Sequence, residues 1–157
     1  MLMSCPICSL HGDQDMRGFE IQRTDLWVLR HHPEPAPLAG WLLLDTVRHC
    51  SGPLAFNEVE AEDWGRATRD ASRLVQTMTG CDRVYAIAFG EGAQHLHLHL
   101  IPRFVSDPST QAWSVADHYR AVASGERTPA AAEDVHALVQ SARALCSNQA
   151  LVVGMAR

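Results

Sequence analysis

The sequence has no long hydrophobic run and no excess of basic charge. No apolar stretch approaches the roughly 18 residues of a membrane helix, and the first residues lack the charged and apolar regions of a secretory signal. The formal net charge is −5, whereas domains that bind nucleic acid are usually basic. We therefore expect a cytoplasmic protein whose partner is a small molecule, with no membrane and no nucleic-acid partner.

Cysteine is scarce, and repeats, low-complexity segments and Gly-rich phosphate-binding loops are absent. Five cysteines in 157 residues do not form the pattern of a disulfide framework, so Cys50, Cys81 and Cys146 are expected to be free buried thiols. A chain of this length with 46% hydrophobic residues can bury one core. We expect a single domain over residues 1–157.

The hydrophobic pattern predicts an α+β fold. Apolar residues recur at three- and four-residue spacing over 59–79, with Gly80 as a stop, which predicts one long helix. A weaker helix is predicted at 113–123, and Thr128-Pro129 is a good start for a further helix near the C-terminus. Short strands are predicted at 19–23, 26–30, 41–44, 84–89, 95–101 and 150–153.

The most informative stretch is a row of three histidines at two-residue spacing between leucines. Because successive side chains of a strand point to opposite faces, His95, His97 and His99 share one face and the leucines share the other. Imidazole serves as nucleophile, general acid or base, or metal ligand. A rise of about 3.3 Å per residue puts the outer two about 13 Å apart, too far for one zinc to bind all three. The row therefore predicts divided roles.

Further metal ligands are present near the amino terminus and before the row. Cys5-Pro-Ile-Cys8 is a CxxC knuckle, whose spacing lets two thiolates bind one zinc. A redox pair is the alternative, but a thioredoxin-like pair follows a strand, and none is predicted ahead of this knuckle. His49, together with one histidine of the row, would complete a Cys2His2 zinc site.

The row and its surroundings resemble the histidine triad (HIT) family of nucleotide hydrolases and transferases, over roughly residues 5–104. The family's motif is three histidines separated by single apolar residues and followed by two apolar residues, which 95–101 matches position by position. Zinc-bearing bacterial members also begin with a CPxC-like knuckle, as 5–8 does, and carry a histidine after a basic residue, as 48–49 does. The resemblance implies a HIT-like antiparallel sheet of about five strands with a long packed helix, and an extension at 105–157 with an additional helix.

The resemblance also implies a role for each of these side chains. Zinc-bearing members hold a structural zinc with the knuckle cysteines, the histidine after the basic residue and the first histidine of the row, here Cys5, Cys8, His49 and His95. The middle histidine, His97, attacks the α-phosphorus and forms a covalent nucleotidyl-histidine intermediate. His99 holds phosphate oxygens or aids the leaving group. The implied protein is a homodimeric hydrolase or transferase of dinucleoside polyphosphates or nucleoside phosphoramidates.

Two features depart from the family's pattern. Members typically have a histidine directly after the glycine that opens the strand before His49, whereas Trp41 follows Gly40 here. The loop that leads into the row, Phe89 to Gln94, is also short. A nucleotide-binding protein with weak turnover and a structural zinc is therefore an alternative, and a hydrolase whose zinc activates water is another.

Substrate contacts are predicted less directly. A glutamate beside a phosphate is electrostatically unfavourable, so Glu91 is expected to contact ribose or an amine, or to point away. By analogy with the family, an apolar nucleoside pocket is expected at Ile21, Leu29 and Leu43. The candidate substrate-binding residues are Glu91, Gln94, Arg103 and His32.

Overall fold

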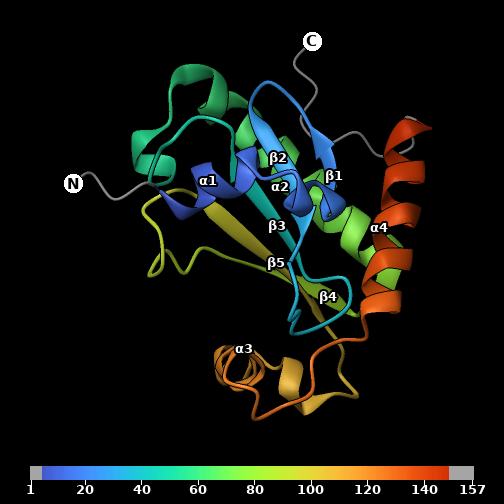
Figure 1. Ribbon diagram of the computed structural model, residues 1–157. Helices are drawn as coiled ribbons and strands as arrows, with labels where there is room; N and C mark the ends of the chain where they lie inside the picture. Colours follow the sequence, from blue (N-terminus) through green and yellow to red (C-terminus); the bar gives the residue numbers. More distant parts are fainter. Residues whose placement is uncertain (1–4, 149–157) are drawn as a thin grey trace.

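The computed structural model describes residues 5–148, in which one antiparallel sheet lies between helices (Figure 1). Its five strands follow the order β1-β2-β3-β5-β4. They are Glu20–Arg23 (β1), Trp27–His31 (β2), Leu42–Thr46 (β3), Arg83–Ile87 (β4) and His97–Arg103 (β5). The α-helices of the described residues are Pro6–Gly12 (α1), Glu58–Thr79 (α2), Val115–Ala123 (α3) and Ala132–Ser147 (α4). The predicted α+β fold is confirmed; the strand predicted at 150–153 lies outside the described residues.

The long helix α2 begins and ends where local interactions require. The Asn57 side chain accepts the backbone N–H of Glu60, while the Glu60 carboxylate accepts the backbone N–H of Asn57. At the other end, Gly80 takes the left-handed conformation with φ 65°, which glycine adopts without a steric penalty. The face of α2 that packs on the sheet carries the buried residues Ala67, Ala71, Leu74 and Val75.

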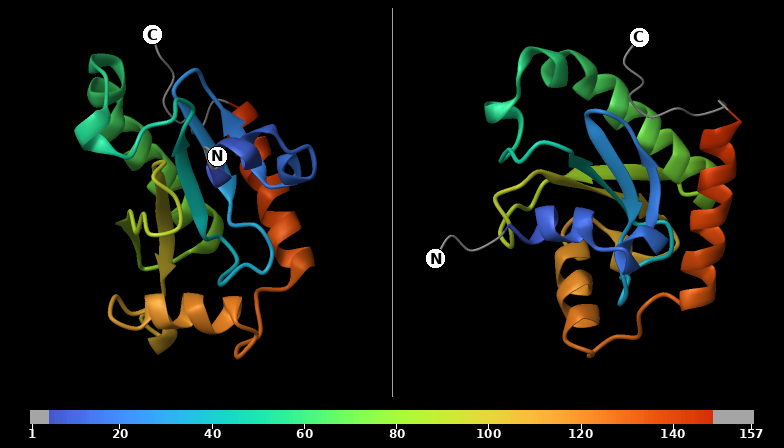
Figure 2. Two further views of the ribbon diagram at one scale, coloured as in Figure 1. Left: turned by 60° about the vertical axis from the view of Figure 1, so that its left-hand side comes forward. Right: turned by 45° about the horizontal axis from the view of Figure 1, so that its top comes forward.

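Helices cover both faces of the sheet (Figure 2). On one face, α2 contacts β5 and β4, and α4 contacts β1 and β2. On the other face lie α1 and α3 (Figure 2). None of the helices in residues 5–148 combines the length and hydropathy of a membrane span.

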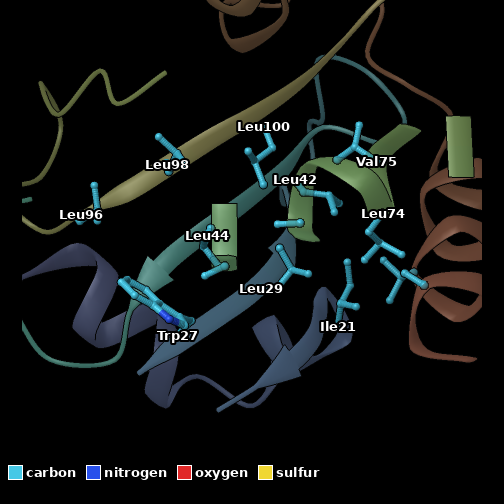
Figure 3. Packing of buried hydrophobic residues seen from close by; sticks show 14 of the residues in the cluster. Ile21, Trp27, Leu29, Leu42, Leu44, Leu74, Val75, Leu96, Leu98 and Leu100 are labelled. Atoms are coloured by element: carbon cyan, nitrogen blue, oxygen red, sulfur yellow. The ribbon is translucent and has the colours of Figure 1, made fainter. Parts of the chain in front are cut away.

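The strand register determines which residues reach each face. Leu44 of β3 lies opposite Leu98 of β5, and both pack into the main core beneath α2 (Figure 3). In the neighbouring pair of the register, Asp45 of β3 lies opposite His97 of β5 on the other face. The predicted division of the row into a leucine face and a histidine face therefore matches the structure.

Helix α4 begins at Ala132 rather than at Pro129. The backbone N–H of Ala130 donates to the carbonyl oxygen of Ala36 at 2.9 Å, and Ala131 has extended dihedral angles. This long-range hydrogen bond holds the preceding residues extended, so the helix starts later than the Thr-Pro signal predicted.

Candidate functional site

Four side chains that are distant in sequence meet beside the start of β5. Cys5 caps α1, Cys8 lies within it, His49 follows β3, and His95 precedes β5 by two residues. Their ligand atoms all lie within 4.8 Å of one another. Cys8 Sγ is 3.4 Å from Nδ1 of His95 and 3.5 Å from Nδ1 of His49. A tetrahedral zinc with bonds of about 2.3 Å to sulfur and 2.0 Å to nitrogen separates such ligands by about 3.6 Å, so the cluster fits zinc.

The backbone orients His95 toward this cluster. Its Nε2 lies 2.8 Å from the carbonyl oxygen of Thr46, and because that oxygen can only accept, Nε2 carries the proton. The lone pair of Nδ1 then faces the sulfurs of Cys5 and Cys8, at 3.5 and 3.4 Å. Burial lowers the pKa of His95, which favours the neutral ring that metal binding needs.

A buried ion pair attaches α1 to the sheet. Asp45 is fully buried, and its carboxylate accepts hydrogen bonds from Arg30 Nε at 2.7 Å and His11 Nε2 at 2.9 Å. His11 is near the end of α1, the helix that contains the knuckle. The hydrogen bond between His11 and Asp45 therefore attaches α1 to the sheet and helps to position the cysteines.

His97 is oriented by the same strand. Its Nδ1 lies 2.7 Å from the carbonyl oxygen of His95, which again accepts, so the proton of the neutral ring is on Nδ1. The lone pair of Nε2 remains available. A nucleophilic histidine needs this arrangement, because the nitrogen that attacks must be unprotonated.

His99 has the opposite tautomer. The indole Nε1 of Trp41 lies 3.0 Å from Nδ1 of His99 and can only donate, so the proton of the neutral imidazole is on Nε2. The second and third histidines of the row thus differ: His97 presents a lone pair at Nε2, and His99 presents an N–H donor there.

A cavity of about 340 Å³ lies beside these two histidines. A larger cavity of about 800 Å³, on the polar side of α3, shares only Arg120 with it. The smaller cavity is lined mostly by apolar surface, with its polar groups at the histidines, a glutamate and an arginine. The lining residues are Phe89, Glu91, Gly92, His97, His99, Ala116, Tyr119 and Arg120.

The wall formed by α3 was not anticipated from the sequence. A helix was predicted at 113–123, but nothing in its pattern indicated that Tyr119 and Arg120 would lie beside the histidines. The Tyr119 ring is 5.9 Å from the His99 ring between centroids, nearly perpendicular to it. Arg120 is exposed and pairs with Asp117 one turn earlier. The C-terminal extension therefore contributes part of the candidate site.

The structure divides the predicted substrate-binding residues. Glu91 lines the cavity, whereas Gln94 is exposed and lies outside its lining. His32 is half-buried and packs edge-to-face against Trp41 and Tyr119, close to the cavity without lining it. Burial is the main reason that the pKa of His32 falls to about 4.

Arg103 does not line the cavity. It is buried at the far end of β5, where Nη1 donates to the carbonyl oxygens of Phe104 and Asp107 and to the Thr110 hydroxyl. These bonds fix the turn after the strand. Nη1 is used within this turn, whereas the buried Nε has no hydrogen-bond partner among the described residues, and the contact of Arg103 with substrate stays a prediction.

The apolar residues expected at a nucleoside pocket are also divided between the faces. Ile21 and Leu29 belong to the main core on the α2 side of the sheet (Figure 3). Leu43 lies opposite His99 in the β3–β5 pairing and points to the histidine face. The expectation was therefore wrong for Ile21 and Leu29, because their strand positions turn them away from the row.

The fold is similar to solved structures of histidine triad proteins. A zinc-bound family protein from Mycobacterium smegmatis aligns with a TM-score of 0.65 and 17% identity, over 94% of this chain and 98% of that one. A hypothetical histidine triad nucleotide-binding protein from Sulfolobus tokodaii gives a TM-score of 0.66 and 16% identity, over 92% and 93%. A histidine triad protein from Bradyrhizobium japonicum gives 0.59 and 22%, over 84% and 94%. No family model and no curated protein matches the sequence.

Fold and motif lead to the same assignment. The sheet order, the helix layers and the position of the histidine row come from the coordinates, while the motif at 95–101 comes from the sequence. The similarity extends over most of this chain and most of each solved structure described above. The chain therefore has the fold of the histidine triad proteins.

Proposed function

We propose that this protein is a nucleotide hydrolase or nucleotidyl transferase that acts at the α-phosphate of a nucleoside phosphate derivative. The observation that carries the proposal is the hydrogen bond from His97 Nδ1 to the carbonyl oxygen of His95, which leaves the Nε2 lone pair available beside a cavity. Dinucleoside polyphosphates and nucleoside phosphoramidates are the candidate substrate types.

The reaction proceeds in two displacements. His97 Nε2 attacks the α-phosphorus in line, an N–P bond forms, and the bond to the leaving group breaks with its electron pair on that group. Water or another acceptor then attacks the phosphorus, and the N–P electron pair returns to His97. The acceptor's proton passes to solvent, and the neutral imidazole is regenerated. His99 donates its Nε2–H to a phosphate oxygen in both steps.

Zinc has a structural role in this proposal. Cys5, Cys8, His49 and His95 supply four ligands, the number that fills a tetrahedral structural site. Bound zinc supplies stability and fixes the strand, because the carbonyl oxygen of His95 is also the acceptor that orients His97. A closed set of protein ligands argues against the alternative in which zinc activates water, since that chemistry needs an open position.

The second candidate function is a nucleotide-binding protein with weak turnover. Trp41 favours it, because an indole stands where relatives typically have an imidazole, and an indole cannot exchange a proton with His99. The fold, the zinc ligands and the cavity would be unchanged in such a protein. Only a measurement of turnover separates the two functions.

The assembly and location are part of the same proposal. Related proteins pair two units into a continuous sheet, and β4 is an edge strand of the sheet in this chain. We propose a cytoplasmic homodimer that takes a small nucleotide and binds neither nucleic acid nor membrane. Sedimentation at several concentrations tests the dimer.

Intact-protein mass spectrometry tests the function directly. The protein is mixed with a panel of adenosine and guanosine polyphosphates and phosphoramidates and quenched without acid, beside His97→Ala. His136→Ala is the matched control, because this histidine is exposed on α4 and remote from the cavity. We expect a nucleotidyl adduct on the parent protein and the control, and none on His97→Ala. Saturable binding without any adduct or product would favour the second candidate.

A further inference from the structure

Trp41 is fully buried directly before β3 and contacts the third histidine of the row. Its indole Nε1 lies 3.0 Å from Nδ1 of His99, and the two ring planes meet at 82°. The indole is itself held in place, since Trp41 packs with Ile101 and Val115 in a second buried cluster and against the Tyr119 ring. Its orientation relative to His99 is therefore determined by the packing of α3 on the sheet.

An indole N–H donates and never accepts, so the hydrogen bond admits one tautomer of the neutral imidazole. We propose that Trp41 is a positioning residue that fixes His99 as a neutral ring with its proton on Nε2. This ring donates a hydrogen bond to a phosphate oxygen but does not protonate the leaving group. The inference rests on the proposed function and assigns the leaving groups that the site handles.

The surroundings of His99 also favour the neutral ring. Burial is the largest cause that lowers the pKa of His99, to about 3, and repulsion from three neighbours adds to it: His97, His32 and Arg30. Asp45 acts in the opposite direction but is already paired with Arg30. Protonation at Nδ1 would also place two N–H groups against each other, so the charged ring is disfavoured by geometry as well as by electrostatics.

Leaving groups differ in whether they need this proton. A phosphate or polyphosphate leaves with the electron pair of the broken P–O bond as a stable oxyanion. An amine that leaves with the pair of the P–N bond must gain a proton in the same step, because an amide anion is too basic to be expelled. A site whose nearest imidazole stays neutral therefore favours oxyanion leaving groups. Arg120 and Glu91 both line the cavity, and Arg120 is paired with Asp117, so the preference follows from the neutral imidazole and not from the net charge of the lining.

The tautomer is measurable without any substrate. Long-range 15N–1H NMR correlations of histidine-labelled protein distinguish the two neutral tautomers and the charged ring, and the His99 signals are assigned by their loss in His99→Gln. We expect the Nε2–H tautomer near neutral pH in the parent protein. A charged ring or the Nδ1–H tautomer would overturn the inference, whether or not the protein has activity.

Kinetics then test the consequence for the leaving group. Trp41→Phe keeps an aromatic ring and removes the N–H, so Nδ1 of His99 becomes free to take a proton. We compare kcat/KM for an adenosine polyphosphate with kcat/KM for an adenosine phosphoramidate. In Trp41→Phe the ratio of the first value to the second should fall by about tenfold or more, since a general acid typically contributes at least this much. An unchanged ratio in a folded variant would overturn the inference.

Trp113→Phe is the matched control for this experiment. Trp113 is 93% exposed in the segment before α3, and it does not line the cavity. The Trp113→Phe substitution should leave both the kcat/KM ratio and the His99 spectrum unchanged. If Trp41→Phe fails to fold, the parent NMR spectrum still decides the tautomer. If the parent protein turns over neither substrate, the proposed function fails, while the spectrum tests the positioning role by itself.

Discussion

Asp45→Asn should lower the free energy of unfolding by about 3 to 5 kcal/mol, the cost of leaving a buried charge without its partner. In the parent protein the Asp45 carboxylate accepts two hydrogen bonds from Arg30, at 2.7 and 3.3 Å, and one from His11 at 2.9 Å. Arg30 is only 4% exposed. An amide keeps the shape but has one acceptor oxygen and no charge, so the guanidinium stays buried and unneutralised.

The pH dependence of this effect follows from the carboxylate. Burial raises the pKa of Asp45, but the charge of Arg30 and the hydrogen bonds from His11 and Arg30 outweigh burial, and the net pKa is below its ordinary value of 3.8. A carboxyl with a depressed folded-state pKa stabilises the protein above its unfolded pKa, and this contribution is lost as the pH falls through the folded value. The difference between parent and Asp45→Asn should therefore be constant near neutral pH and shrink below about pH 4.

Urea unfolding at several pH values measures both effects. Asp117→Asn is the control, because it makes the same substitution in an exposed pair, with Asp117 and Arg120 side chains 74% and 70% exposed. Exposed pairs of this kind often contribute nothing measurable. A loss in Asp45→Asn no larger than in this control at pH 7 would show that the buried pair does not hold α1 on the sheet.

Two further changes test the metal site and the turn before β3. Cys8→Ser should remove one zinc per chain and lower the midpoint of thermal unfolding by about 5 °C or more, because binding of a structural metal contributes to folding. Metal analysis and calorimetry measure the two effects. The control is Cys146→Ser, because Cys146 lies outside the cluster. Gly40→Ala should cost about 1 to 3 kcal/mol, because φ is +88° and the new Cβ would lie 2.3 Å from Cγ2 of Thr79. Gly65→Ala, in α2 with open space around it, should instead stabilise the protein by about 0.5 to 1 kcal/mol, and equal unfolding midpoints for the two glycine variants would contradict the strain argument.

Much of the fold could be predicted from local patterns. Period-two alternation placed His97 and Leu98 on opposite faces of a strand, and the three- and four-residue spacing of apolar residues predicted α2. These predictions held because they depend on the backbone geometry of a few neighbouring residues. The predicted start of α4 was wrong, because the backbone N–H of Ala130 donates to the carbonyl oxygen of Ala36, far away in sequence, and this bond competes with the local signal.

The candidate metal ligands and the histidine row were identified in the sequence by residue type, spacing and resemblance. That the four ligand atoms lie within 4.8 Å of one another could only come from the folded chain. The tautomers of His97 and His99 likewise depend on which groups face their ring nitrogens. For His99 that group is Trp41, 58 positions earlier in the chain. The sequence alone indicates only that Trp41 occupies a position where family members typically have a histidine.

The sequence by itself determined the strand that carries the histidines, the long helix and the identity of the candidate metal ligands, because each is encoded in spacing or side-chain chemistry. Only the tertiary structure decided that Arg103 fixes a turn, that Ile21 and Leu29 belong to the core, and that α3 forms a wall of the cavity. The physical reason is that a side chain's partners depend on strand register and helix packing. Those are set by long-range burial of apolar surface, and no short segment encodes them alone.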